Sequence, residues 1–477
     1  MSTNREKGAT GAGYEAKRLL LQDEGALGLR LLAWGYRFVL VALMAVAVFC
    51  FSAFPQAFPA NSRLMALGVY ALLLIALQNV YRACQIGQSR VSELLMYQLL
   101  ANLLSGGALY LGVALYAHQL ATPVPLLCTV ALQTLLGILW SILSNRHYFK
   151  HRRKPRTIII CGQQAEVDLL YQSPYFHDKY DVCKLIENPE EDFDTLRKAV
   201  EGCEVLFSVG SHAEITNGLA KLCVEMGIKG YFTPRLGHII MAGAEHRVNF
   251  SFPLLRVERA DGHNEYRLFK RAFDILCAVM GLIVLSPIML ATAIAIWLDD
   301  HGPVFYRQVR LTRNGREFNI LKFRSMSVGA EKDGVARLAG QNDSRITRVG
   351  KFIRACRIDE LPQLINILLG DMSVVGPRPE RPEIARQYEQ TLPEFSLRLQ
   401  VKAGLTGLAQ VYGRYNTEPY HKLQMDLMYI NEMSFIKDLQ LILATLKILF
   451  VKESTQGVAQ GHQTAQRTSP SSDRMAS

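Results

Sequence analysis

The hydrophobic positions of the chain gather first in four long stretches near its N-terminus. These are residues 31–54, 64–81, 94–116 and 123–143. Each approaches the roughly 20 apolar residues that a helix needs to cross a bilayer. The pattern predicts a bundle of four transmembrane helices over 31–150, after a polar segment, 1–30, that does not read as a cleavable signal peptide.

Basic residues flank this predicted bundle mainly at its two ends. Lys and Arg precede the first stretch, and the run "NRHYFKHRRKPR" follows the fourth, whereas the loop "AHQLATP" has neither. Because cytoplasmic loops are enriched in Lys and Arg, we expect both ends of the bundle in the cytoplasm. We expect no Asp, Lys or Arg deep in the bundle, which favours an anchor or scaffold over a transport path.

From Thr157 the pattern changes to strands that alternate with helices. The strand "TIIIC" is followed by "CEVLFSVG" (203–210) and by a helix and strand over 215–232. This alternation predicts a Rossmann-like parallel α/β domain over 155–260. Only Gly162 stands where a dinucleotide loop needs three glycines, so we favour a spacer or regulatory domain. The "DFD" at 192–194 is interpreted as a solvated loop rather than a metal motif.

A fifth apolar stretch, about 272–298, is also long enough to span a bilayer. Ser286 and Pro287 fall near its middle, and proline kinks or breaks a helix. Both flanks are basic, so we expect a re-entrant helix that enters and leaves on the cytoplasmic side. Ser286 is expected to satisfy backbone groups that the proline frees. The alternative is a proline-kinked fifth span.

Residues 305–414 combine many basic residues with short polar motifs. Asn314-Gly315 predicts a hairpin, whose second strand ends on Lys322 and Arg324. Four basic residues then recur every third position and predict a stripe on one side of a helix, suited to anionic headgroups or a lipid phosphate. They are Arg348, Lys351, Arg354 and Arg357.

Asp359 and Glu360 follow this stripe, just before Pro362 and the amide of Gln363. Neighbouring helical residues diverge by about 100°, so the two carboxylates suit two different roles beside one substrate. One can act as a nucleophile in phosphoryl transfer, and the other can hold Mg²⁺. Pro362 suits the first turn of a following helix, whose amides favour anions. Gln363 is counted with the expected substrate-binding residues.

Two further motifs suit phosphate binding. Arg378 lies between two prolines, in a stiff turn that could present its guanidinium to a phosphate. The segment "VKAGLTGLAQVYGRY" (401–415) contains Lys402, three glycines and Arg414, and we expect it to form a loop that closes on a phosphate.

The ordered motifs "KFRSM", "RIDELPQLINILLGDMSVVGPRPE" and "VKAGLTGLAQVYGR" follow a helix interrupted by Ser-Pro. Over about 266–450 the chain thereby resembles the monotopic phosphoglycosyl transferases, which are polyprenyl-phosphate hexose-1-phosphate transferases of the bacterial sugar transferase type. The preceding domains resemble those of large exopolysaccharide-initiating members, of the Psl or colanic-acid type. Ala403 stands where the family often has proline, and we expect it to loosen that loop.

The resemblance implies a two-step reaction. Asp359 would attack the β-phosphate of a UDP-hexose, with glucose the expected sugar and galactose or mannose-type donors left open, and release UMP. Undecaprenyl phosphate would then take the sugar phosphate from Asp359, in the first membrane step of exopolysaccharide synthesis. Glu360 would hold Mg²⁺, and Arg414 would contact the nucleotide. The remaining cations would bind phosphates or organise the site; they are Lys322, Arg324, Arg354 and Arg378.

The resemblance also implies an architecture and a location. We expect a membrane α/β protein with a four-helix transmembrane bundle, a Rossmann-like middle domain (155–260) and a C-terminal α/β catalytic domain (266–452) with a re-entrant helix. A disordered tail would follow over 453–477, after an apolar helix at 438–451. The expected location is the bacterial inner membrane, with both later domains cytoplasmic and in contact with lipids. A homodimer is left open.

Charge and cysteine usage narrow the alternatives. The 53 Lys and Arg exceed the 42 Asp and Glu by 11 charges, but no DNA-binding module is present, so nucleic acid is not an expected partner. The 9 cysteines form no CxxC pair, which argues against a zinc site or disulfide framework. Two alternatives stay open: a membrane glycosyltransferase that releases UDP, and a nucleotide-sensing membrane scaffold.

Overall fold

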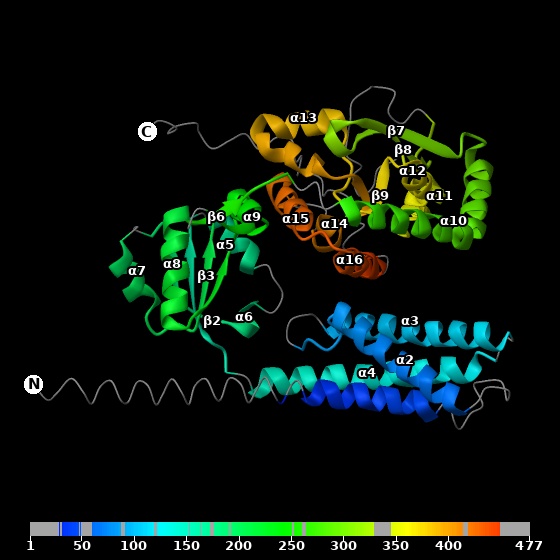
Figure 1. The fold of residues 1–477 in the computed structure, drawn as a ribbon, viewed down its shortest axis with the longest axis horizontal. Coiled ribbons are helices and arrows are strands. Elements are labelled where there is room, and N and C mark those ends of the chain that lie inside the picture. The colour runs from blue at the N-terminus through cyan, green and yellow to red at the C-terminus, as the bar shows by residue number, and fades with distance from the viewer. Residues whose placement is uncertain are drawn as a thin grey trace, which may run out of the picture. The chain divides into compact units, whose positions relative to one another are not determined.

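The computed structural model describes most of the chain in two compact units, Met1–Thr233 and Pro234–Ser477 (Figure 1). The described residues are 28, 31–46, 48, 60–86, 91–118, 122–151, 153–162, 164–171, 176–189, 192–249, 252–259, 264–328, 345–413 and 418–448. Arg414 and the predicted disordered tail lie outside these ranges, and so does part of the first predicted span.

The first unit begins with apolar helices whose outer faces expose large aliphatic side chains. They are Leu31–Val46, α2 (Ala60–Val80), α3 (Val91–Ala117) and α4 (Val124–His151). Among the described residues, α2, α3, α4 and the later helix α10 are long and apolar enough to cross a membrane. Leu72 and Leu115 are more than two-thirds exposed, as expected of side chains that face lipid. Three of the four predicted spans are therefore helices long and apolar enough to cross a membrane, and the first is described only over a shorter helix.

The interior of this helical bundle is partly polar. Arg37 is only 8% exposed, and it donates to the side-chain oxygens of Gln78 and Asn79 at 3.0 and 2.6 Å. Gln133 likewise donates to the carbonyl of Leu40. Arg37 is therefore a buried charge beside the last residues of α2, where amide oxygens stabilise its guanidinium, and the expectation of no charge deep in the bundle stays a prediction.

The second part of this unit is a parallel sheet covered by helices on both faces. Its strands are β1 (Arg156–Cys161), β2 (Asp181–Glu187), β3 (Val205–Val209) and β4 (Lys229–Phe232), in the order β2-β1-β3-β4. Alternate residues of β1 face opposite sides. Ile158 and Ile160 pack with α7 (Phe193–Val200) and α8 (Ala213–Met226), whereas Ile159 packs with α5 (Gln164–Tyr171) and α6 (Phe176–Lys179). The predicted parallel α/β arrangement is present.

Two sequence features of this sheet domain have structural explanations. A Cβ on Gly162 would lie 2.3 Å from the carbonyl oxygen of Gly210, so the glycine is needed where two strand ends approach closely. Asp192, interpreted from the sequence as part of a solvated loop, is the N-cap of α7 and accepts from the backbone N–H of Thr195 at 3.0 Å. The "DFD" motif therefore begins a helix.

The second unit starts earlier than the sequence pattern suggested. Helix α9 (Leu236–Ala242) contributes Leu236 and Ile239 to the C-terminal core, although residues 234–260 were expected to belong to the middle domain. An antiparallel hairpin of β5 (Glu245–Asn249) and β6 (Phe252–Arg256) follows it. Burial against the C-terminal helices assigns α9 to this unit, which no local pattern could indicate.

Helix α10 (Asn264–Asp300) is the long apolar element of this unit, and Figure 1 shows it turning partway along its length. Pro287 lies inside it and cannot donate to the carbonyl of Ile283. The hydroxyl of Ser286 donates to that carbonyl at 2.8 Å, as the sequence predicted. Ala278, before the proline, packs in the main core, whereas Ile296, after it, packs in a separate cluster.

A hairpin and a set of short helices complete the unit. Strands β7 (Phe305–Leu311) and β8 (Glu317–Phe323) pair antiparallel, and Asn314 and Gly315 both have positive φ, so the predicted hairpin is confirmed. The later elements are α11 (Arg348–Ala355), η2 (Ile358–Glu360), α12 (Gln363–Leu369), β9 (Met372–Val375), α13 (Pro382–Thr391), η3 (Pro393–Gln400), β10 (Ala403–Thr406), α14 (Leu408–Tyr412), α15 (Pro419–Asn431) and α16 (Phe435–Ile448).

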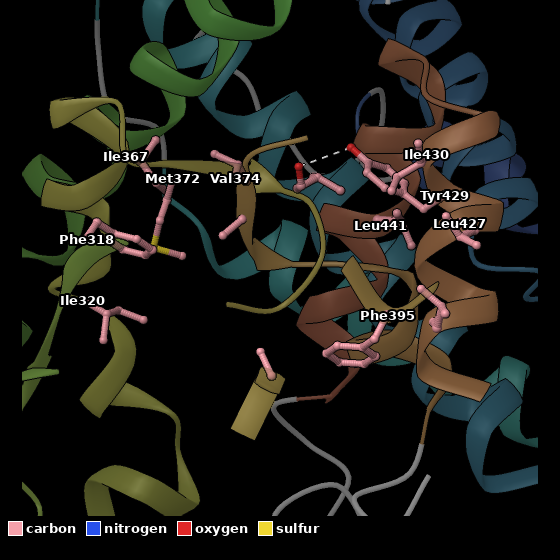
Figure 2. Close-up of a cluster of buried hydrophobic side chains, with 14 of the residues drawn as sticks. Phe318, Ile320, Ile367, Met372, Val374, Phe395, Leu427, Tyr429, Ile430 and Leu441 are labelled. Carbon is pink, nitrogen blue, oxygen red and sulfur yellow. Dashed lines mark hydrogen bonds between the residues drawn. The ribbon is translucent and has the colours of Figure 1, made fainter. Parts of the chain in front are cut away.

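The core of this unit joins elements that are far apart in sequence. Figure 2 shows Phe318 and Ile320 of the hairpin near Met372, and Phe395 near the C-terminal helices. Strands β9 and β10 pair in parallel beside this core. The predicted apolar helix at 438–451 corresponds to α16, which exposes Ile436 and buries Leu441. The core therefore holds β9 and the loops at its ends in fixed positions.

Candidate active site

The two adjacent carboxylates lie on a short 3-10 turn between two helices. Helix α11 ends at Ala355, and Arg357 adopts a left-handed conformation with φ of 54°. The turn η2 carries Asp359 and Glu360, and α12 begins only at Gln363, after Pro362 at its N-cap. The sequence placed the carboxylate pair directly before a helix, and the structure agrees closely: the reversal at Arg357 separates the pair from α11, and only Leu361 and Pro362 separate it from α12.

Glu360 is held between two cations. Its Oε1 accepts from Lys322 Nζ at 2.9 Å and from Arg378 Nη2 at 2.8 Å. Burial opposes ionisation of this carboxyl, but Arg378 and Lys322 outweigh burial, so the pKa of Glu360 lies well below its usual range. Glu360 is therefore a permanent anion that brings β8, η2 and the loop after β9 together.

Asp359 is in the opposite situation. The described residues offer its carboxylate neither a hydrogen bond nor an ion pair within contact distance. Burial, followed by the charge of Glu360, raises the pKa of Asp359 to about 6, although Lys322, Arg354 and Arg378 act against the rise. Of the two adjacent acids, Glu360 is thus held in ion pairs, whereas the Asp359 carboxylate is available to contact a substrate.

The predicted cations divide into two groups. Lys322 and Arg378 contact Glu360, and Arg354 is near enough to lower the pKa of Asp359. Arg324 is different, because it is 8% exposed and pairs with Asp300 at the end of α10. It therefore joins the hairpin to the end of α10, and its predicted role in phosphate binding or site organisation stays a prediction.

Gln363 and the basic stripe also have defined positions. Gln363 is only 3% exposed in the first turn of α12, so its amide is buried in this structure. Arg348, Lys351 and Arg354 lie on α11 as predicted, but Arg357 lies beyond the helix end. The helical stripe is therefore shorter than expected. Arg414, predicted to contact the nucleotide, lies outside the described residues.

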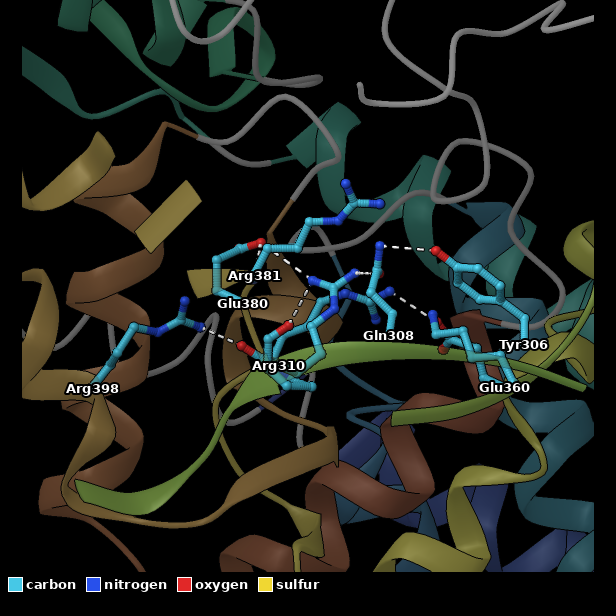
Figure 3. A network of polar contacts seen from close by, with 10 residues as sticks. Tyr306, Gln308, Arg310, Glu360, Glu380, Arg381 and Arg398 are labelled. Carbon is cyan, nitrogen blue, oxygen red and sulfur yellow. Dashed lines mark hydrogen bonds and ion pairs between the residues drawn. The ribbon is translucent and has the colours of Figure 1, made fainter. Parts of the chain in front are cut away.

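The loop that carries Arg378 is fixed by arginines that the sequence analysis did not single out. Arg398 donates to the carbonyl of Arg378 at 2.9 Å, and it pairs with the buried Asp426 at 2.7 Å. Arg310 donates to the carbonyl of Pro379 at 3.2 Å and approaches Glu380 (Figure 3). These contacts hold the proline-flanked turn from both sides. Only the excess of arginine in this region could have suggested them.

Two glycines of the predicted phosphate loop, Gly404 and Gly407, pack closely against the backbone of Gly376. A Cβ on Gly404 would lie 2.1 Å from the backbone nitrogen of Gly376, and one on Gly407 would lie 2.2 Å from its carbonyl oxygen. Lys402 lies near Gly370 instead, where burial and then Arg271 lower the pKa of its amine. These two glycines therefore allow β10 to lie directly against the start of the Arg378 loop.

Ala403 lies at the start of β10, next to this contact. Its backbone N–H donates to Thr312 Oγ1 at 3.2 Å, a hydrogen bond that proline could not make. The same threonine hydroxyl donates to the carbonyl of Asp371 at 2.7 Å. The expectation that Ala403 loosens this loop stays a prediction, because the hydrogen bond to Thr312 does not measure how the loop moves.

The residues fit a magnesium ion held mainly by substrate. Within the described part of the chain, His, Cys, Asp and Glu form no group of three that could enclose a metal. Mg²⁺ is commonly bound by one or two carboxylates, with phosphate oxygens and water completing the shell. Glu360 is ionised and uses only Oε1 in its two ion pairs, and Asp359 is adjacent. The donor set is therefore of the right kind.

Fold and site together define a membrane-associated α/β protein with a carboxylate pair among fixed cations, beside a long apolar helix. Residues 265–452 match the bacterial sugar transferase family. A galactosyl transferase, CpsE, of Streptococcus agalactiae is 30% identical over 64% of this chain and 74% of its own length. The chain belongs to the bacterial sugar transferase family.

Two other relatives match over the C-terminal part. A UDP-N-acetylgalactosamine-undecaprenyl-phosphate N-acetylgalactosaminephosphotransferase of Aeromonas hydrophila is 42% identical over 39% of this chain and 44% of its own length. A UDP-glucose:undecaprenyl-phosphate glucose-1-phosphate transferase of Escherichia coli is 42% identical over 39% of this chain and 41% of its own. The chain thus spans less than half of the length of these two relatives.

Proposed function

We propose that this protein transfers hexose-1-phosphate, with glucose as the sugar, from a UDP-hexose to undecaprenyl phosphate and releases UMP. The names of two relatives that match the C-terminal part support a UDP-sugar donor and this lipid acceptor. The product would be the lipid-linked sugar with which exopolysaccharide synthesis begins. The single observation that carries the proposal is the difference between Asp359, which is available, and Glu360, which is held by Lys322 and Arg378.

In the first step the Asp359 carboxylate attacks the β-phosphorus of the UDP-hexose. The bond from that phosphorus to the bridging oxygen breaks, UMP leaves, and the sugar phosphate is bonded to Asp359. A pKa of about 6 leaves most Asp359 molecules ionised at neutral pH while making the carboxylate more basic than a typical one. An anion next to Glu360 can still receive a phosphate because Lys322, Arg354 and Arg378 balance the local charge.

In the second step a phosphate oxygen of undecaprenyl phosphate attacks the same phosphorus. The bond to Asp359 breaks, the free carboxylate is restored, and the lipid leaves with a diphosphate-linked sugar. Mg²⁺, when bound near Glu360, would neutralise charge on the phosphate oxygens. The Arg398 side chain fixes the Arg378 backbone through its carbonyl, and Glu360 orients the Arg378 guanidinium, so this group is preorganised to bind a phosphate. Arg414 would contact the nucleotide.

Helix α10 would place the active site at the membrane surface, where the soluble UDP-hexose and the lipid acceptor can meet. We propose that it is re-entrant, with both arms returning to the cytoplasmic side of the bacterial inner membrane. Its exposed apolar residues, such as Leu290, suit contact with lipid, and the Ser286 contact makes the break at Pro287 tolerable in an apolar medium. Arg324 and Asp300 would then fix the distal arm beside the catalytic hairpin.

The nucleotide product tests the proposal. The full chain in detergent is incubated with Mg²⁺, undecaprenyl phosphate and single UDP-sugars, and UMP and UDP are separated. We expect UMP from UDP-glucose, and no UMP from Asp359→Asn. Asp371→Asn is the matched control, because Asp371 pairs with the exposed Arg316 and is expected to leave turnover unchanged.

Other products would identify the alternatives. Release of UDP would mean that only the sugar moves and that the protein is a glycosyltransferase. UMP from another UDP-sugar would replace glucose but keep the reaction. Binding of nucleotide with no turnover of any donor would support the nucleotide-sensing scaffold.

A further inference from the structure

Two cysteines of the parallel sheet domain lie close together and are not joined by a disulfide bond. In β2, Val182 lies opposite Thr157 and Lys184 lies opposite Ile158, so Cys183 is an extra residue in a β-bulge. A bulge redirects the side chain of the extra residue. The thiol of Cys183 consequently reaches the carbonyl of Thr157 at 3.2 Å, at the start of the neighbouring strand β1.

Cys203 approaches the same place from the other side of β1. It precedes β3, which pairs with β1 through Thr157 and Val205. The sulfur atoms of Cys183 and Cys203 are 3.9 Å apart, and both thiols are free. A disulfide needs a separation of about 2 Å, so the two sulfur atoms must approach each other by roughly a further 2 Å before the bond can form. Cys183 is exposed and Cys203 is buried.

We propose that Cys183 and Cys203 form a reversible disulfide in this domain when the protein meets a small disulfide or a thiol–disulfide oxidoreductase as oxidant. The bond would link the edge strand β2 to the residues just before β3, across the intervening strand β1. Neither the family's reaction nor the carboxylate site uses these residues, so the inference is independent of the proposed function. Intracellular disulfides of this kind are commonly transient and redox-sensing.

The accessibility of the two thiols indicates the order of events. The exposed Cys183 thiolate attacks one sulfur of the oxidant, forms a mixed disulfide and releases the first thiol. Cys203 then loses its proton and attacks the Cys183 sulfur, which releases the second thiol. Two S–H bonds are lost, one S–S bond forms, and the oxidant's disulfide is reduced to two thiols.

The environment of Cys203 agrees with the role of second nucleophile. Burial, and then the neighbouring Cys183 thiol, raise the pKa of Cys203 to about 11, while Lys184 and Arg156 act in the opposite direction. A thiol that is seldom ionised reacts slowly with an oxidant in solution. Its attack becomes fast only when the mixed disulfide is held beside it, 20 residues away in sequence and adjacent in space.

Peptide mapping of the oxidised full chain tests the inference. The detergent-solubilised protein is exposed to oxidised glutathione, remaining thiols are alkylated, and the chain is cut with trypsin. Cleavage after Lys179, Lys184, Lys198 and Lys221 puts the two cysteines on separate peptides, 180–184 and 199–221. We expect these peptides to be linked by a disulfide, and dithiothreitol to separate them.

Matched variants distinguish the pair from general thiol oxidation. Cys356 is exposed and outside the pair, so Cys356→Ser should leave the linked peptide unchanged. Cys183→Ser should abolish it and slow oxidation of Cys203 at least about tenfold. Glutathione retained on Cys183 with Cys203 still free, or linkage of Cys203 to another cysteine, would overturn the inference.

Discussion

Glu360 accepts a hydrogen bond from Lys322 through the same carboxylate oxygen that contacts Arg378. One acid therefore joins the strand β8, the turn η2 and the proline-flanked loop. Because Glu360 is committed in this way, the adjacent Asp359 keeps its carboxylate available. The division of roles between two neighbouring acids rests on these contacts.

Removal of the lysine amine is expected to impair chemistry more than folding. In Lys322→Met, Glu360 keeps its contact with Arg378, but the site loses one of the cations that balance two acids and an incoming phosphate. We expect the rate of UMP release to fall about 10²–10³-fold. Lys437→Met is the control, since Lys437 pairs with Glu432 at the surface. Equal activities of the two variants would show that Lys322 does not act on the substrate.

The pH dependence of UMP release should report Asp359. Its raised pKa of about 6 means that the carboxyl gains a proton, and loses its nucleophilic form, as the pH falls through 6. Glu360 stays ionised over this range because its pKa is lowered. Single-turnover rates should be about tenfold lower at pH 5 than at pH 7. A flat profile down to pH 5 would exclude Asp359 as the attacking group.

The same shift predicts that Asp359 costs the protein stability. A carboxyl whose pKa is raised on folding contributes stability below its unfolded pKa, and that contribution is lost as the pH rises through 6. Asp359→Asn removes the penalty. At pH 8 the variant should be more stable by at most about 3 kcal/mol, and at pH 4, close to the unfolded pKa, the difference should fall to about 0.5 kcal/mol. Thermal midpoints of the two proteins at both pH values provide the measurement; a midpoint lowered at pH 8 would contradict it.

The close approach of β10 to the Arg378 loop predicts a strict glycine requirement. Gly404→Ala would place a Cβ 2.1 Å from the nitrogen of Gly376, so strands must separate. We expect a loss of about 2–4 kcal/mol in the free energy of unfolding. Gly237→Ala, in α9 with open space around it, should change stability by no more than about 1 kcal/mol. Comparable thermal midpoints of the two variants would refute the packing argument.

The bend of α10 predicts the side of the membrane on which the catalytic unit lies. The test uses a chain in which Cys356 is the only remaining cysteine. With the α10 sequence unaltered, an impermeant thiol reagent outside the cell should not label this chain. Pro287→Ala restores a donor for the Ile283 carbonyl and straightens the helix, so a fraction of chains should become labelled. Ser286→Ala keeps the proline and should stay unlabelled. Labelling of the unaltered chain would mean that α10 spans the membrane.

Local patterns were sufficient where neighbouring residues decide the conformation. Asn314 and Gly315 form the turn of the hairpin because both tolerate positive φ. Pro287 removes a helix hydrogen bond, and the Ser286 hydroxyl donates to the carbonyl that is left without a partner. Apolar length alone predicted the membrane helices that the structure describes. The types of residue in the candidate site, two acids among Arg and Lys, were also readable from the sequence.

The sequence did not show which of these acids and cations would form ion pairs with each other. Lys322 and Glu360 are 38 residues apart, and their pairing depends on how β8 packs against η2. Arg324 likewise meets Asp300 at the end of α10, and Gly404 and Gly407 lie directly against the backbone of Gly376. The sequence by itself thus determined the elements and the chemistry available to them. Only the tertiary structure decided which charge meets which, because burial and long-range contacts depend on the whole fold.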